Sequence, residues 1–136
     1  MATRNEIDNN EFQELTDMAD YKAPLRDMRF VMYEVFDVAS QWSQWSAIRE
    51  LVDQETADAI LEEGAKLASR TIAPLNRSGD EEGCSWNDGK VFTAAGYKDA
   101  YDIFAEGGWT GLGGNPAYGG MGMPKVLAAQ FDEMVC

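Results

Sequence analysis

The residues whose spacing could support chemistry begin with a glycine-dense stretch. Between Gly96 and Pro124 lie most of the chain's glycines, and Gly111-Leu-Gly113-Gly114 is part of this stretch. Such a loop can hold a phosphate group on its backbone N–H groups. A P-loop would also need a following Lys with Ser or Thr, and a dinucleotide fingerprint would need a preceding apolar strand. The sequence has neither, so we expect a tight structural turn.

Acidic side chains form two further groups. Glu62 and Glu63 are adjacent, so on a helix they diverge around the axis and do not converge on a substrate. The acidic loop 80–88 is rich in oxygen ligands, but these lack the alternating spacing of a calcium loop and we interpret them as solvated; they are Asp80, Glu81, Glu82, Asn87 and Asp88. With no histidine and only Cys84 and Cys136 as thiols, we expect no metal site.

Two aromatic stripes could line a site for an apolar ligand. Trp42 and Trp45 share a face if they lie on one helix, as do Tyr97, Tyr101 and Phe104 on another. Stripes of this kind are more often core, because burial is the main source of stability for aromatic side chains. The acidic setting of Cys84 favours an inert thiol. The sequence therefore shows no complete catalytic constellation.

The elements that must position these residues are mostly helices. Pro24 suits the first turn of a helix that we expect to be buried on most sides, with an apolar stripe formed by Leu25, Met28, Met32, Val35 and Ala39. Asp53 or Thr56 can cap the next helix, and Pro74 breaks or kinks its end. We expect residues 76–83 to be an exposed acidic loop.

In the second half of the chain we expect, in order, a hairpin turn, a helix, the glycine-rich loop and a last helix. Residues 85–92 contain an Asp-Gly turn and predict a hairpin, which would have to lie on the helices to be stable. Thr93 can cap the following helix, and Pro124 opens a last one. We therefore predict an all-α fold class, a helical bundle with a small irregular or β-hairpin excursion around residues 84–92, preceded by an N-terminal arm over residues 1–20.

Composition excludes several classes of partner. The 136 residues include 24 acidic and 11 basic side chains, for a formal net charge of −13. This charge repels phosphate backbones and anionic lipid, so nucleic acid and membrane surfaces are not expected partners. No apolar run is long enough to span a bilayer, and the first residues lack the apolar centre of a secretory signal. We expect a cytoplasmic protein.

Several blocks of sequence carry a resemblance to a known family. They are Ala19-Asp-Tyr-Lys-Ala-Pro-Leu-Arg-Asp-Met-Arg-Phe-Val-Met-Tyr-Glu-Val-Phe36, then Gly96-Tyr-Lys-Asp-Ala-Tyr101 with Gly108-Trp109, and then Pro116-Ala-Tyr-Gly-Gly-Met-Gly-Met-Pro124. In this order they closely resemble the acyl-CoA dehydrogenase family, and most of all the larger branch that includes methylmercaptopropionyl-CoA dehydrogenases. The resemblance covers nearly all of the chain from about Tyr21 to Cys136.

The resemblance implies one part of an FAD-dependent enzyme of fatty acid metabolism. In this family a glutamate takes the α proton of an acyl-CoA, the β hydrogen passes to the flavin as hydride, and an electron-transfer flavoprotein accepts the electrons. The β-barrel that holds much of the flavin and the C-terminal helical domain that carries the glutamate follow the region matched here. We expect residues 21–136 to be the N-terminal helical domain, truncated before both, and neither Glu106 nor Glu133 to be the base.

The resemblance also places Phe131 and Met134 nearest the wall of the acyl-chain cavity. We expect this chain by itself to bind no FAD and to be inactive. The last helix has an apolar side with no following partner, so we expect the exposed side chains of Leu127, Phe131 and Met134 to mediate homo-oligomerisation. The alternative is a stand-alone acidic helical interaction module. It explains the charge but not the ordered family blocks.

Overall fold

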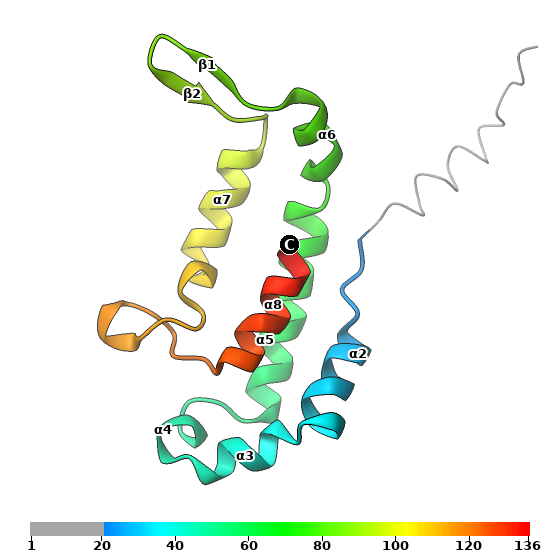
Figure 1. Ribbon diagram of the computed structural model, residues 1–136, viewed down its shortest axis with the longest axis vertical. Helices are drawn as coiled ribbons and strands as arrows, with labels where there is room; N and C mark the ends of the chain where they lie inside the picture. The colour runs from blue at the N-terminus through cyan, green and yellow to red at the C-terminus, as the bar shows by residue number, and fades with distance from the viewer. Residues whose placement is uncertain (1–20) are drawn as a thin grey trace, which may run out of the picture.

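A long central helix organises the fold. The computed structural model describes residues 21–136, in which this helix, α5 (Gln54–Leu67), continues through a π-helical turn over Ala68–Ile72. Helices α2 (Leu25–Arg29) and α8 (Lys125–Val135) pack on α5 (Figure 1). The prediction of an all-α fold with one small hairpin is confirmed. The predicted arm over residues 1–20 lies outside the described residues.

Shorter elements complete the molecule. A π-helical turn over Phe30–Val35 extends α2, and α3 (Val38–Gln44) and α4 (Ser46–Arg49) lead into α5. After α5 come α6 (Leu75–Glu82), the hairpin strands β1 (Ser85–Asn87) and β2 (Lys90–Phe92), and α7 (Tyr97–Glu106). Two 3-10 turns, Trp109–Gly111 and Pro116–Tyr118, lie in the glycine-rich loop before α8.

The start of α5 follows the predicted capping pattern. The Asp53 carboxylate accepts a hydrogen bond from the Thr56 backbone N–H at 2.8 Å. This satisfies one of the N–H groups that have no partner within the helix. The hydrogen bonding with Thr56 also lowers the pKa of Asp53. Of the two caps that the sequence allowed, the structure selects Asp53.

The core lies between α5 and the helices on either side of it. Leu61, near the centre of α5, is 1% exposed, and Gly64 lies directly against the Phe131 ring. A Cβ atom on Gly64 would be 2.8 Å from Phe131 Cδ2, so this glycine allows α5 and α8 to approach closely. The most deeply buried apolar side chains are Met28, Met32, Ala57, Leu61, Ala68, Leu127 and Phe131.

The helix that begins after Pro24 is buried on one face only. Met28 and Met32 are buried, whereas Phe30, Val35 and Phe36 are exposed. The expectation of burial on most sides is therefore wrong, because α5 covers only the side of α2 that faces it. This helix also ends earlier than its apolar pattern: Asp37 adopts the left-handed conformation, with φ of 45°, and α3 begins after it.

Residues 76–82 form most of helix α6. The expectation that residues 76–83 form a loop is therefore wrong. Pro74 precedes the helix, where its missing N–H has no cost, and an Arg77–Glu81 ion pair of 2.9 Å spans one turn. Gly83, with φ of 66°, ends the helix. The acidic composition suggests a loop because α6 has no buried residue, and an exposed helix can be as acidic as a loop.

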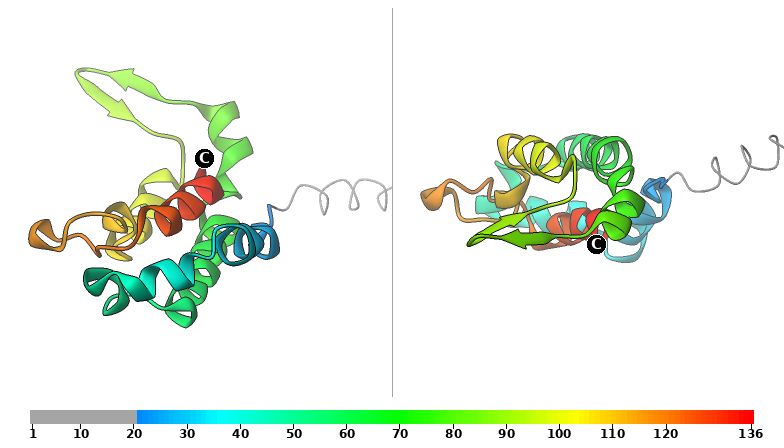
Figure 2. Two further views of the ribbon diagram at one scale, coloured as in Figure 1. Left: turned by 60° about the horizontal axis from the view of Figure 1, so that its bottom comes forward. Right: turned by 90° about the horizontal axis from the view of Figure 1, so that it is seen from above.

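The predicted hairpin forms, but it does not lie on the helices. Asp88 and Gly89 have φ of 47° and 76°, as a type I′ turn requires, and the strands pair antiparallel around them. All residues of both strands are exposed. The hairpin projects beyond α6 and α7 from one end of the helical body (Figures 1 and 2). The expectation that helices support it is wrong.

Two expectations for the last two helices also need correction. Helix α7 begins at Tyr97 after Gly96, with φ of 82°, and not at a Thr93 cap. The side of α8 that was expected to be exposed is buried, with Leu127, Phe131 and Met134 at 5% exposure or less. Packing of α8 on α5 and its π-helical extension, together with aromatic side chains from α7 and the following loop, covers this side.

Candidate functional site

The glycine-rich loop uses its backbone N–H groups within itself. The N–H groups of Gly114 and Met121 both donate to the Gly111 carbonyl at 2.9 Å, and that of Gly122 donates to the Gly114 carbonyl. The two arms of the loop cross so closely that a Cβ on Gly120 would lie 2.2 Å from the carbonyl carbon of Gly114. These bonds form the tight structural turn that the sequence predicts, and they occupy N–H groups that a phosphate would otherwise need.

The strongest candidate site is an aromatic groove where α6, α7 and the end of α8 meet. It is a cavity of about 360 Å³ lined by Ile72, Leu75, Asn76, Tyr97, Ala100, Tyr101, Phe104 and Val135. Tyr97 and Tyr101 remain exposed at the groove, whereas Phe104 is half-buried. The aromatic stripe of α7 thus lines a cavity as well as contributing to the core. Its apolar walls suit a hydrocarbon ligand.

Phe131 and Met134, the residues expected at the acyl-cavity wall, are core residues. Phe131 stacks on Phe104 with ring centroids 5.8 Å apart and on Trp109 at 4.5 Å. Met134 is also buried, and the next residue, Val135, reaches the groove. Phe131 and Met134 lie together against Gly64 in the core, and neither lines the groove; Phe131 contacts it through Phe104.

The sequence reading missed the other half of the groove. Ile72, Leu75 and Asn76 come from the π-helical turn and α6, the segment interpreted partly as a loop. No short motif links these residues to α7, because more than twenty positions of sequence separate them and only the fold brings them together. The available signal is the spacing of Ile72 and Leu75, which are three residues apart and so share a face on a helix.

Two other cavities flank the core. One of about 270 Å³ lies between α5 and the glycine-rich loop, and its lining includes Ala59, Ile60, Trp109 and Met121. Another of about 560 Å³ is bordered by both Trp42 and Trp45. These two tryptophans differ in burial, because α3 ends at Gln44: Trp42 is core, whereas Trp45 lies at the junction with α4 and is 57% exposed.

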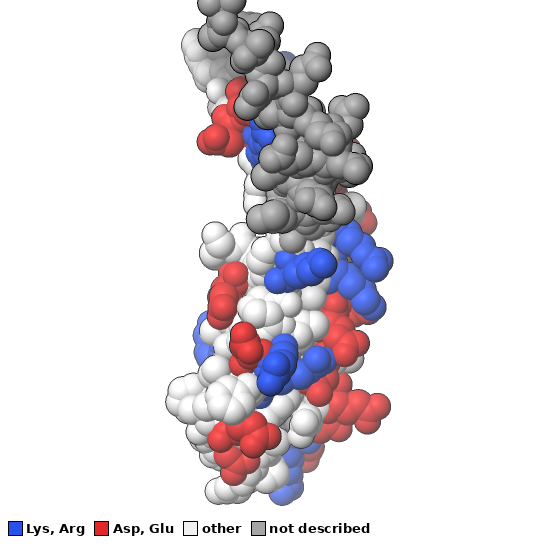
Figure 3. Space-filling view, turned by 90° about the vertical axis from the view of Figure 1, so that its right-hand side faces the viewer, with Lys and Arg blue, Asp and Glu red and all other residues white. Residues whose placement is uncertain are grey.

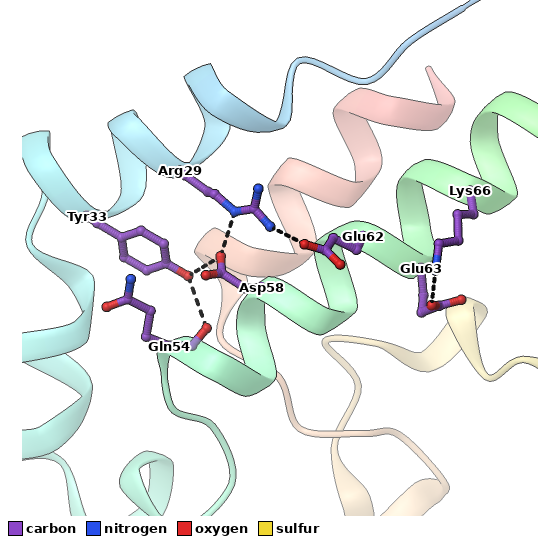
Figure 4. Close-up of polar contacts among 7 residues, drawn as sticks. All are labelled: Arg29, Tyr33, Gln54, Asp58, Glu62, Glu63 and Lys66. Carbon is purple, nitrogen blue, oxygen red and sulfur yellow. Dashed lines mark hydrogen bonds and ion pairs between the residues drawn. The ribbon is translucent and has the colours of Figure 1, made fainter.

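Glu62 and Glu63 diverge as predicted. Glu62 accepts a hydrogen bond from Arg29 at 2.8 Å, and Glu63 pairs with Lys66 at 2.6 Å on the same helix (Figure 4). Their carboxylates therefore belong to separate ion pairs. The arrangement offers no pair of carboxylates to one substrate.

A polar clamp joins α2 and its extension to α5. Asp58 accepts hydrogen bonds from Arg29 Nε at 2.9 Å and from the Tyr33 hydroxyl at 3.1 Å (Figure 4). Burial raises the pKa of Tyr33, and the negative charge of Asp58 raises it further. The hydrogen bond to Asp58 likewise raises the pKa of Arg29. Arg29, Tyr33 and Asp58 are hydrogen-bonded to one another, so we interpret the clamp as structural.

The remaining polar candidates are dispersed. Asp80, Glu81 and Glu82 lie on α6, while Asn87 and Asp88 lie in the hairpin. Among residues 21–136, no group of histidine, cysteine and acidic side chains has the geometry to hold a metal ion. Cys84 and Cys136 are both free and exposed. On the face shown in Figure 3, basic side chains alternate with acidic ones and do not form one patch.

No helix within the described range has the length and apolarity needed to cross a membrane.

Comparison with known proteins gives two informative similarities. The chain is 39% identical over 117 residues to a 3-methylmercaptopropionyl-CoA dehydrogenase of Ruegeria pomeroyi, covering 85% of this chain and 19% of that protein. It is 29% identical over 120 residues to a broad-specificity linear acyl-CoA dehydrogenase of Mycobacterium tuberculosis, covering 87% of this chain and 19% of that protein. The chain thus spans about a fifth of the length of these relatives. No family model matches it.

Proposed function

Because this chain belongs with the acyl-CoA dehydrogenase family, as a match to the N-terminal region of its relatives, we propose that residues 21–136 form the N-terminal helical domain of an FAD-dependent acyl-CoA dehydrogenase. The whole enzyme would catalyse α,β-dehydrogenation of an acyl-CoA thioester. The observation that carries this proposal is the 39% identity over 85% of the chain. Residues 1–20 would be an arm that precedes the domain.

In this proposal the aromatic groove forms one side of the acyl-chain cavity. Leu75, Ala100 and Phe104 offer an apolar wall that would exclude water from a hydrocarbon chain. We propose that Phe131 and Met134 act on that wall from the core, Phe131 through its stack on Phe104. What supports the assignment is that the groove and these two residues belong to one packed unit.

The flavin and the catalytic base come from other parts of the proposed parent enzyme. The N–H groups of Gly114, Met121 and Gly122 already donate to carbonyls of the glycine-rich loop, which disfavours the FAD pyrophosphate there. FAD supplies the hydride acceptor in the parent, and the residues of this chain would contribute only substrate enclosure and support. We expect this chain by itself to bind no FAD.

The proposed partners follow from the same assignment. They are the rest of the parent chain, an acyl-CoA substrate, an electron-transfer flavoprotein and further copies in a homo-oligomer, all in the cytoplasm. The formal charge of −13 disfavours nucleic acid as a partner. The alternative function, a stand-alone acidic interaction module, would account for this charge without any chemistry.

The groove is tested in the longer enzyme by filling it. Ala100 lines the groove, and Ala59 lines the separate cavity beside the glycine-rich loop. We expect Ala100→Trp to lower kcat/KM for acyl-CoA oxidation by about tenfold or more, a loss of ~1.4 kcal/mol of transition-state stabilisation. The matched control, Ala59→Trp, should change it by less than about twofold, since its cavity shares no lining residue with the groove.

Two outcomes would contradict the proposal. If both substitutions change kcat/KM equally, the groove is not part of the acyl site. A coding sequence that stops after Cys136, with no dehydrogenase activity in the product, would favour the interaction module. Continuation of the reading frame into a β-barrel and a second helical domain supports the enzyme.

A further inference from the structure

A groove with a basic rim lies between the first described residues and the end of α5. Its cavity has a volume of about 380 Å³. Lys22 and Leu25 line it from the start of α2 and the residues before that helix. Ala65, Lys66 and Arg70 line it from α5 and its π-helical extension. We call this cavity the basic groove, because three of these five residues are cationic in a chain with 24 acidic and 11 basic residues.

The described residues neutralise the charge of the basic groove only in part. Glu62 also lines the groove, but its carboxylate pairs with Arg29 at 2.8 Å. Lys66 pairs at 2.6 Å with the carboxylate three residues before it on the same helix. Within residues 21–136, Lys22 and Arg70 form no ion pair. A carboxylate that enters the groove therefore meets two positive charges with no acidic partner in the described part of the chain.

The segment that precedes Tyr21 has the complementary composition. Residues 1–20 contain six acidic side chains and one basic side chain. Glu11, Glu14 and Asp17 recur at every third position, and each is followed directly by a large apolar residue. On a helix this spacing would place an acidic face beside an apolar face. The basic groove offers both kinds of partner, because its cations surround an apolar floor formed by Leu25 and Ala65.

The covalent connection holds this segment close to the basic groove. Tyr21 follows the segment directly, and Lys22 already lines the groove. From Asp17 to Tyr21 an extended chain reaches up to ~13 Å, so the Asp17 carboxylate can return over the groove. A tether of this length corresponds to an effective concentration on the order of millimolar. The segment can therefore occupy a site that is weak for a free ligand.

We propose that residues 11–18 bind in the basic groove of the same chain. The carboxylate of Asp17 pairs with Arg70, and the apolar residues of the segment pack on Leu25 and Ala65. Exposed ion pairs are individually weak, so the tether and the apolar floor maintain the contact together with them. The contact is independent of the proposed enzyme function, because the basic groove shares no lining residue with the aromatic groove.

The response to salt separates this contact from the average charge of the molecule. Residues 21–136 contain 18 acidic and 10 basic side chains, so the molecule as a whole repels the acidic segment. Salt screens attraction and repulsion alike. A segment that is held by the basic groove is released as the ionic strength rises. A segment that responds only to the net charge approaches the molecule more closely under the same conditions.

Disulfide trapping in the 136-residue chain tests the proposal. Thr16→Cys places a thiol in the segment and Ser69→Cys places one in the groove lining, in a chain whose two exposed cysteines are replaced by serine. We expect the disulfide to form about fivefold faster or more at low salt than at high salt. Arg70→Glu should slow it by about fivefold or more at low salt. The matched control is Arg77→Glu, which reverses an 89% exposed arginine on α6 and should leave the rate unchanged.

A charge exchange distinguishes loss of the contact from a fault in folding. Adding Asp17→Lys to Arg70→Glu should restore the rate to within about twofold of the parent rate, because the two side chains again have opposite charges. If far-UV circular dichroism shows that Arg70→Glu loses the helical fold, Lys22→Glu takes its place. A rate that rises with salt overturns the proposal, as does a rate that Arg70→Glu and Arg77→Glu change equally. A disulfide that forms between two chains also overturns it, since the segment would then bind a second copy.

Discussion

Gly64 shows how one residue sets the distance between two helices. It lies in the middle of α5, where glycine is unfavourable for helix formation by about 1 kcal/mol relative to alanine. Its missing Cβ leaves the space occupied by the Phe131 ring, which also stacks on Trp109 and Phe104. The local cost is therefore offset by aromatic packing across α5 and α8.

This packing predicts that replacing two helical glycines by alanine has different effects on the free energy of unfolding. Gly64→Ala should lower the free energy of unfolding by about 1–3 kcal/mol, because the new methyl group would overlap a buried ring. At Gly79 in α6, the nearest atoms belong to Tyr97, which is 40% exposed and can rotate away. We expect Gly79→Ala to stay within about 1 kcal/mol of wild type. Urea unfolding of both variants checks this, and wild-type stability in Gly64→Ala would contradict it.

At the scale of elements, the clamp between α2 and α5 joins segments that are distant in the sequence. Asp58 accepts hydrogen bonds from Arg29 on α2 and from Tyr33 on its π-helical extension. The folded state raises the pKa of Tyr33, so the protonated hydroxyl is favoured by folding. The stabilisation is complete below the unfolded tyrosine pKa of about 10 and is lost as pH rises from there through the higher folded-state pKa.

The clamp thus predicts a specific response to alkaline pH. At pH 8, Tyr33→Phe should be less stable than wild type by about 1 kcal/mol, the usual value of one hydrogen bond. The difference should narrow above pH 10, with a slope of at most ~1.4 kcal/mol per pH unit because a single proton is involved. Urea unfolding between pH 8 and 11 measures this slope. The control is Tyr118→Phe, since Tyr118 is 91% exposed, and a constant difference for Tyr33→Phe would contradict the prediction.

Helix α6 and the hairpin show where local sequence signals succeed and where they fail. The Asp88-Gly89 pair specified its turn type, because both residues tolerate positive φ. Residues 76–83 were interpreted as a loop because they are acidic and contain glycine, yet they form α6 with an Arg77–Glu81 pair along it. An exposed helix needs no apolar stripe, so the sequence of α6 has no helical repeat of apolar residues that would predict it.

For the whole molecule, the central question is how much of an enzyme these residues can supply. The chain spans about a fifth of the length of its relatives. Its described core is continuous through α2, α5 and α8, so we expect it to fold by itself. Mixing purified chain with excess FAD and removing free flavin should leave no flavin absorbance at 1:1 stoichiometry. Bound flavin at that ratio would show that our assignment of the cofactor site to other regions is wrong.

The sequence by itself determined the helical class, the Asp88-Gly89 turn and the family resemblance. These depend on residues close together in the chain or on ordered blocks of sequence. The tertiary structure decided which apolar faces are covered: it buried Trp42, Phe131 and Met134 and left Trp45 and Trp86 exposed. It also assembled the aromatic groove from α6, α7 and α8. Burial depends on neighbours that are distant in sequence, and periodicity identifies an apolar face without identifying the surface that packs against it.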